Sequence, residues 1–204
     1  MATSMIVRGS DRVRKESQRG FSLLEVLISM AVLTVGLVSL LGVFGLAMAS
    51  TQTSQQDMIA KQLANEALES IVTARNTSQL GWDDIQNVGS AFCSSGASTC
   101  GIFLTGTNQI YNSGADGIFG TSDDTAAGEQ TLEVPGPDGI YGNPDDVRIP
   151  LTGYQRTILI SPVYDSNNNL VTSLRAVNVT VQYATTQARL PKTYVLSTYI
   201  SQYQ

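Results

Sequence analysis

The chain has 204 residues, of which 42% are hydrophobic and only 14% are charged, and its formal net charge is −5. It contains no histidine, which excludes histidine-based acid–base catalysis, histidine-ligated zinc and Ser-His-Asp triads. The charge is unevenly distributed: residues 1–20 hold five basic and two acidic residues, whereas residues 76–147 hold no basic residue. That acidic region is a poor candidate for a nucleic-acid site, because phosphate groups need cationic partners.

A long apolar run follows the basic N-terminal segment. Residues 26–49 carry no charge, and the run that begins at Phe21 is about 29 residues long, enough for a helix to cross a hydrocarbon core of roughly 30 Å. The basic residues before it predict a cytoplasmic N-terminus. An ordinary secretory signal, cut near residues 47–49, or a simple signal anchor is the alternative. Neither explains Glu25, because an unpaired acid in a membrane helix costs a few kcal/mol.

Residues 19–27, RGFSLLEVL, resemble the class III signal of type IV prepilins and pseudopilins. The resemblance implies that prepilin peptidase cuts between Gly20 and Phe21, removes the leader of residues 1–20 and methylates the new terminal phenylalanine. It also implies that Glu25 pairs with the terminal amine of a neighbouring subunit during assembly. Such pairing offsets the desolvation of both charges and makes the acid a device that sets register.

An amphipathic pattern extends the helix beyond the apolar run. Ile59, Leu63, Ala67 and Ile71 follow an i, i+4 row, and no proline interrupts the preceding run. We therefore predict one helix of about 50 residues. Its membrane and assembly half covers residues 21–50, its amphipathic half covers residues 51–76, and a globular head of residues 77–204 packs on the second half.

Two cysteines, Cys93 and Cys100, lie in a stretch rich in serine and glycine. If the head is exported, a disulfide closing a small loop is the natural interpretation, and a pair of free thiols is the alternative.

An acidic pattern occurs twice within residues 114–146. Residues 114–124 read GADGIFGTSDD and residues 136–146 read GPDGIYGNPDD. Closely spaced aspartates on a loop bent by glycine supply the oxygen ligands that Ca²⁺ prefers. The predicted ligands are Asp116, Asp123, Asp124, Asp138, Asp145 and Asp146. No Lys or Arg lies among the acids of this segment, and without a cation that density of charge is self-repelling.

These loops depart from the EF-hand pattern, so a second interpretation stays open. The repeats would then be a pair of Asp-Gly turns in a solvated acidic segment. Their apolar pairs, Ile118/Phe119 and Ile140/Tyr141, would serve as packing anchors.

The C-terminal third has the pattern of strands. Residues 154–163 are rich in β-branched side chains, Val177, Val179, Val181 and Tyr183 alternate with polar residues, and residues 193–201 form a third run. An Asp- and Asn-rich turn at residues 165–169 separates the first two runs. This pattern predicts an antiparallel β-meander over residues 154–201 packed on the long helix, an α+β class that the pilin resemblance also implies.

The resemblance implies a structural subunit of a type IV pilus. Residues 60–71 resemble PilV-type minor pilins and also the I-type pseudopilins of type II secretion. The size of the head favours the pilus over the secretion system, and within the pilus we expect a minor pilin. The implied partners are other pilin subunits, prepilin peptidase and the assembly platform in the inner membrane. The subunit would sit in the bacterial inner membrane before assembly and in the extracellular filament or its tip afterwards.

Other functions stay open beside this one. A major pilin and a secretion pseudopilin are the nearest alternatives, and a monomeric membrane-anchored module that binds a ligand through a cation is the alternative of another class. We find no nucleophile–base pair, phosphate loop or catalytic metal cluster in the sequence, so we expect no enzyme. Cell adhesion, DNA uptake and motility belong to the assembled pilus and have no signature in these residues.

Overall fold

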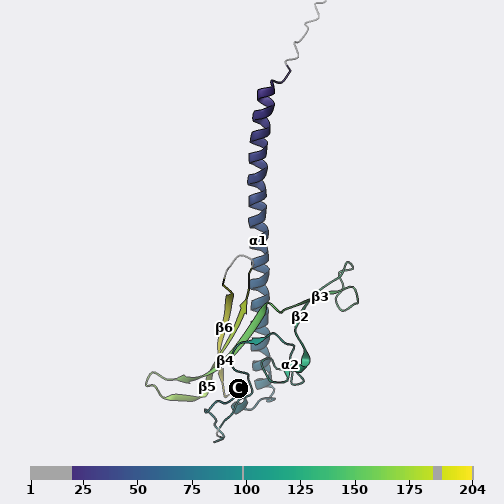
Figure 1. Ribbon diagram of the computed structural model, residues 1–204. Helices are drawn as coiled ribbons and strands as arrows, with labels where there is room; N and C mark the ends of the chain where they lie inside the picture. Colours follow the sequence, from purple (N-terminus) through teal and green to yellow (C-terminus); the bar gives the residue numbers. More distant parts are fainter. Residues whose placement is uncertain (1–19, 98, 186–189, 204) are drawn as a thin grey trace, which may run out of the picture. The chain divides into compact units, whose positions relative to one another are not determined.

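The computed structural model describes residues 20–97, 99–185 and 190–203 (Figure 1). Most of the predicted leader, residues 1–19, therefore lies outside the described residues. The chain divides into two compact units, Met1–Ala47 and Met48–Gln204. Helix α1, Leu23–Asn76, contributes its first part to one unit and its second part to the other.

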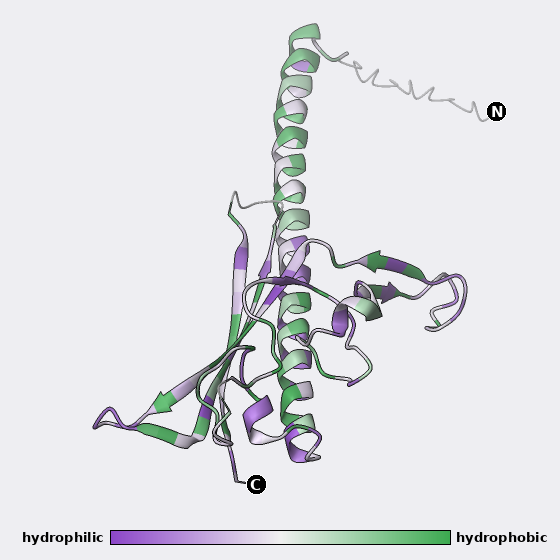
Figure 2. Ribbon diagram, turned by 60° about the horizontal axis from the view of Figure 1, so that its bottom comes forward, coloured by the Kyte–Doolittle hydropathy of each residue, from purple (hydrophilic) through white to green (hydrophobic). Residues whose placement is uncertain are grey.

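The described part of the first unit consists of the residues before α1 and the apolar part of that helix. Green and pale residues follow this part of the ribbon in Figure 2, because leucine, valine and alanine dominate the sequence. Its few hydroxyl side chains stay within the helix: Ser29, Thr34 and Ser39 each donate a hydrogen bond to the carbonyl oxygen four residues earlier, at 2.7 to 2.8 Å. Hydroxyls bonded in this way are compatible with an apolar environment.

The second unit is built on a four-stranded antiparallel sheet in the order β1-β4-β5-β6. Its strands are β1 (Asn108–Gln109), β4 (Tyr154–Tyr164), β5 (Leu170–Tyr183) and β6 (Lys192–Ser201). A separate two-stranded sheet pairs β2 (Thr131–Val134) with β3 (Val147–Pro150). Two short helices complete the unit, η1 (Trp82–Asp84) and α2 (Asp124–Ala127).

The core lies between the second part of α1 and the inner face of the four-stranded sheet. One cross-strand row of the sheet joins Ile158, Val179 and Leu196. The helix contributes six buried residues to the same cluster, four of them alanines: Ala60, Leu63, Ala64, Ala67, Ile71 and Ala74. Small side chains on this face let the helix backbone approach the large β-branched residues of the strands.

The predicted α+β class is confirmed, with a long helix that packs on an antiparallel sheet. β4, β5 and β6 contain the three predicted strands, and Asp165 to Asn169 form the turn between β4 and β5. The predicted row of the helix lies against the core: Leu63, Ala67 and Ile71 are buried, and Ile59 is partly buried and packs against the same cluster. Ala60, Ala64 and Ala74 extend this face, and their small side chains allow a close approach of helix and sheet.

Close packing makes a specific prediction for Ala67, which is fully buried. We expect Ala67→Leu to lower the free energy of unfolding by about 1–3 kcal/mol, because added methylenes overpack the interface between helix and sheet. Denaturant unfolding of the full chain in detergent measures this loss. The control is Gln62→Leu, at an exposed position of the same helix, which should change stability by no more than about 0.5 kcal/mol. Equal effects of the two variants would contradict the packing account.

Candidate functional site

The predicted processing junction lies just before α1. Gly20 and Phe21 are exposed and belong to no helix or strand. Glu25 lies in the first turn of α1, where its backbone N–H donates to the carbonyl oxygen of Ser22 at 3.0 Å. A negative side chain in the first turn is favoured by the helix dipole. The junction is therefore an accessible segment that leads directly into a helix with an acid at its start.

Within the part of the chain that the structure describes, α1 is the one helix long and apolar enough to cross a membrane, judged by length and composition. Its large apolar side chains from Leu23 to Met48 are exposed. The membrane-capable segment thus begins three residues after Gly20.

The two acidic loops are copies of each other in structure as well as in sequence. In the first loop, the N–H groups of Gly114 and Gly120 donate to the two carboxylate oxygens of Asp124 at 3.1 and 2.6 Å. In the second, the N–H groups of Gly136 and Gly142 donate to Asp146 at 3.2 and 2.6 Å.

Two further features recur in both copies. The third residue of each loop accepts a hydrogen bond at 2.9 Å from the N–H two residues later, in Asp116 with Ile118 and in Asp138 with Ile140. The glycine at the start of each loop is also required, since a Cβ there would lie 2.1 Å from a carboxylate oxygen of Asp123 or Asp145. The aspartates therefore shape the loops by accepting backbone hydrogen bonds.

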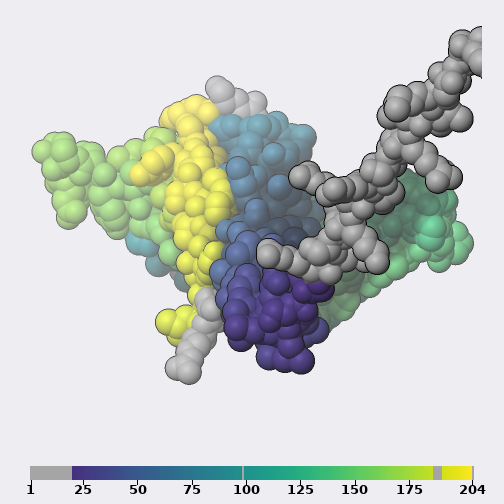
Figure 3. All heavy atoms as spheres, turned by 90° about the horizontal axis from the view of Figure 1, so that it is seen from above, coloured from purple at the N-terminus to yellow at the C-terminus, as the bar shows by residue number. Residues whose placement is uncertain are grey.

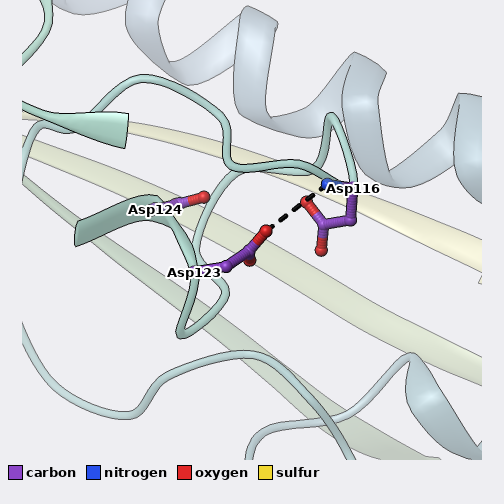
Figure 4. A group of neighbouring side chains, drawn as sticks. All are labelled: Asp116, Asp123 and Asp124. Carbon is purple, nitrogen blue, oxygen red and sulfur yellow. Dashed lines mark hydrogen bonds between the residues drawn. The ribbon is translucent and has the colours of Figure 1, made fainter. Parts of the chain in front are cut away.

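The first loop brings three carboxylates together. One carboxylate oxygen from each of Asp116, Asp123 and Asp124 lies within 4.8 Å of the others (Figure 4). The hydroxyl of Thr121 donates to Asp123 at 2.6 Å and is the main cause that lowers the pKa of this carboxyl group. Burial raises the pKa of Asp124, although the hydrogen bonds from the backbone amides of Gly120 and Gly114 lower it. This arrangement offers oxygen ligands from one short loop.

A buried arginine compensates the first loop. Arg156 on β4 is only 4% exposed, and its guanidinium carbon lies 4.7 Å from the centroid of the Phe119 ring. Burial lowers the pKa of this guanidinium to about 10, while the charges of Glu66 and Asp124 raise it. The acidic segment itself contains no basic residue, and the fold supplies Arg156 from β4, further along the chain.

The second loop differs from the first in its surroundings. The side-chain amide of Asn143 donates to Asp138 at 2.6 Å, at the position that Thr121 holds in the first loop. Among the described residues, Asp138, Asp145 and Asp146 do not form a group of three carboxylates like that of the first loop. Ile118 and Phe119 are 1% and 8% exposed, as expected of packing anchors, whereas Ile140 and Tyr141 are 63% and 65% exposed. The anchor interpretation therefore holds only for the first copy.

The disulfide predicted between Cys93 and Cys100 is present, and it closes a loop beside η1. Asp83 ties this loop to η1, because it accepts hydrogen bonds from the N–H groups of Ser94 and Ser95 at 2.7 Å. Burial raises the pKa of the Asp83 carboxyl group. The hydrogen bonds from Ser94 and Ser95 outweigh burial and hold this pKa well below its usual range.

Trp82 anchors the segment after α1, as its position in the sequence suggests. Its indole N–H donates to the carbonyl oxygen of Thr172 at 2.9 Å. The guanidinium of Arg175 lies 4.1 Å from the centroid of the Trp82 ring, and it donates to the carbonyl oxygen of Ile85 at 2.8 Å. Trp82, Thr172 and Arg175, together with part of the disulfide loop, line a cavity of about 270 Å³.

Sequence reasoning missed the two buried arginines. A usable signal was present, because Arg156 has the same strand parity as Ile158 and Ile160, and Arg175 has the parity of Val177 and Val179. Parity predicts that both side chains enter the core. It does not reveal their partners, which come from α1, the acidic loop and η1.

A family model described as the prokaryotic N-terminal methylation motif matches residues 16–41. No curated protein and no solved structure matches the chain significantly. The matched segment contains Gly20, Phe21 and Glu25 and extends into the apolar part of α1.

The repeat offers a matched pair of substitutions. Gly120 and Gly142 occupy equivalent positions with φ of +91° and +87°, where an L-residue is strained by about 1–2 kcal/mol. A Cβ at Gly120 would also lie 2.5 Å from Cδ1 of Ile158, whereas nothing lies within 4 Å at Gly142. We expect Gly120→Ala to destabilise the protein by about 1–3 kcal/mol more than Gly142→Ala, because only the former overpacks the core. Denaturant midpoints measure the difference, and equal losses would show that Ile158 accommodates the methyl group.

Proposed function

The chain carries a type IV prepilin-like class III signal at its N-terminus, and from this we propose that it is a minor structural subunit of a type IV pilus. The observation that carries the proposal is the methylation motif at residues 16–41, which leads directly into the apolar helix α1. The motif and the α+β fold are those of a subunit that assembles with other pilin-like subunits after processing by prepilin peptidase, and not those of an enzyme.

The finer assignment to the minor pilins rests on two features. Residues 60–71 resemble the PilV-type minor pilins and the I-type pseudopilins alike, and the head of residues 77–204 is large for an I-type pseudopilin. A major pilin and a secretion pseudopilin are the competing subunit types. Neither accounts for both features together.

In the proposed pathway the basic N-terminal segment stays in the cytoplasm and α1 crosses the inner membrane. Prepilin peptidase then reaches the exposed Gly20–Phe21 junction. Cleavage creates an amine at Phe21, a few residues before Glu25. An amine and a carboxylate are each costly in lipid, so pairing Glu25 with the amine of a neighbouring subunit stabilises both and sets the register of assembly.

The mass of the N-terminal peptide from the native membrane protein tests this pathway. We expect a chain that begins at methylated Phe21, and we expect Gly20→Ala to keep residues 1–20, because the implied peptidase cuts after glycine. Glu25→Ala is the matched variant: it should be processed normally, yet its recovery in sheared filaments should fall about tenfold or more, since an unpaired amine would remain in the apolar assembly.

Other outcomes would contradict specific parts of the proposal. A native chain that keeps residues 1–20 would identify a simple membrane anchor, and a chain that starts near Ser50 would identify an ordinary secreted protein. Normal recovery of Glu25→Ala in filaments would remove the pairing role. A processed chain that never enters filaments would favour the monomeric binding module.

We further propose that the acidic repeat binds calcium. The support is the convergence of Asp116, Asp123 and Asp124 within 4.8 Å in a loop of oxygen-bearing side chains, which suits a hard cation. Arg156 and the backbone amides already compensate part of this charge. Calcium would therefore add to a preformed loop.

Calcium at about 100 times its dissociation constant would stabilise the folded chain by about 2.7 kcal/mol, which corresponds to a rise of roughly 5–10 °C in the thermal midpoint. We expect this rise for the full chain in detergent, measured with calcium and with chelator. Asp123→Ala combined with Asp145→Ala should remove the rise, because each substitution deletes a predicted ligand. Asp165→Ala, in the β4–β5 turn, should leave it intact. An unchanged midpoint of the unmodified chain would rule out the site.

A further inference from the structure

The hairpin of β2 and β3 presents an exposed apolar surface. We define the β2–β3 arm as residues 131–150, which comprise both strands and the second acidic loop. Within the second unit, the arm projects on the side opposite the β4–β5 hairpin (Figures 1 and 3). Its exposed large apolar side chains are Val134, Ile140, Tyr141, Val147 and Ile149. Exposed patches of this kind on a folded unit mark interaction sites.

The apolar pair of the first acidic loop is buried, whereas the equivalent pair at the tip of the arm is exposed. Both loops have the same three kinds of Asp–backbone hydrogen bond, so the two apolar pairs are presented by equivalent backbones. Ile118 and Phe119 are nevertheless buried, whereas Ile140 and Tyr141 are about two-thirds exposed. The difference lies in the surface that receives each pair. Among the residues that the structure describes, the first pair has a seat within its own chain and the second pair has none.

The seat of the first pair defines the chemistry that the second pair requires. On α1, the hydroxyl of Ser70 accepts a hydrogen bond from the N–H of Phe119 at 3.3 Å, and the side-chain amide of Gln79, just beyond the helix, donates to the carbonyl oxygen of Asp116 at 2.6 Å. Arg156 covers the Phe119 ring and offsets the charge of Asp124. The seat is thus the apolar cluster on the sheet-facing side of α1, with Ser70 at its edge and a basic residue from β4 beside it.

Charge points to a basic group on the partner as well. The arm contains Glu133, Asp138, Asp145 and Asp146, and its one basic residue in the sequence is Arg148. Arg148 is bonded to Glu133 at 3.3 Å, across the hairpin. The tip therefore presents a tyrosine ring and acids, for which a cation above the ring is the complement.

We propose that the tip of the β2–β3 arm docks on a neighbouring subunit of the same filament, and that the pair Ile140 and Tyr141 enters an apolar helix face with a polar side chain at its edge and a Lys or Arg above the Tyr141 ring. The first acidic loop is the intramolecular template of this contact. The proposal rests on the proposed role as a pilus subunit and names the interaction that the arm makes there. An aromatic ring that becomes covered on docking is the usual kind of anchor for such a contact.

Photo-crosslinking in the producing cell tests the contact. p-Benzoylphenylalanine replaces Tyr141 in one variant and Val32, in the apolar part of α1, in a second variant. We expect both variants to give adducts with another pilin subunit, and mass spectrometry should place the Tyr141 adduct on a helical peptide of that subunit. A Val32 adduct without a Tyr141 adduct would overturn the docking inference and leave the pilus role standing. The absence of both adducts would overturn the pilus role itself. A Tyr141 adduct with a protein other than a pilin subunit would overturn the docking inference.

The duplicated loops provide the matched variants for a second readout. Ile140→Ser with Tyr141→Ser should leave the thermal midpoint of the full chain unchanged, because these side chains are exposed. The same double variant should lower the recovery of the protein in filaments about tenfold. Ile118→Ser with Phe119→Ser should instead lower the midpoint strongly, because it puts hydroxyls into the core. Normal filament recovery of the first double variant would overturn the inference.

Discussion

The close approach of α1 to the four-stranded sheet is the constraint on which the second unit depends. Alanines 60, 64, 67 and 74 face large residues of β4 and β5, and this combination of small against large fills the interface. The helix and the residues just after it also position the segments beside the sheet. Ser70 and Gln79 hold the first acidic loop on one side, and Arg75 donates to the carbonyl oxygen of Ser201 at the end of β6. The helix is therefore both a core element and the frame for the loops.

Two arginines are buried in this apolar core, and each has partners that compensate its charge. Arg175 is held by backbone carbonyl oxygens around η1, by the Trp82 ring and by Asp83, 3.7 Å away. Arg156 is held by the Phe119 ring, by the carbonyl oxygen of Leu63 and by the charges of Glu66 and Asp124. Each arginine links a strand to a loop that has little apolar surface of its own. Removing a partner of a buried charge is strongly destabilising, so these links specify where the loops lie.

The sequence predicts the parts of this fold that follow a local period. The helix, the alternation of β5 and the turn at Asp165 all repeat within a few residues, so composition and spacing locate them. The positions of the acidic loops are different, because they depend on Arg156, Ser70 and Gln79, which are distant along the chain. The two copies have similar sequences and share three Asp–backbone hydrogen bonds, yet one is buried in part and the other is exposed. Local sequence therefore predicts the form of each loop but not its surroundings.

The same distinction applies to Glu25. Asp124 is a buried acid, and Arg156, elsewhere in its own unit, offsets part of its charge. Glu25 lies in an apolar helix, and residues 21–60 contain no basic side chain at all. Within the proposed function, the cation must then come from the amine that cleavage after Gly20 creates. In this account Glu25 gains that partner only when subunits meet, which links processing to assembly through a single charge. The exposed pair of the β2–β3 arm follows the same logic with apolar surface in place of charge. In both cases the described part of the chain contains no complement next to the group, and assembly is the process that would supply it.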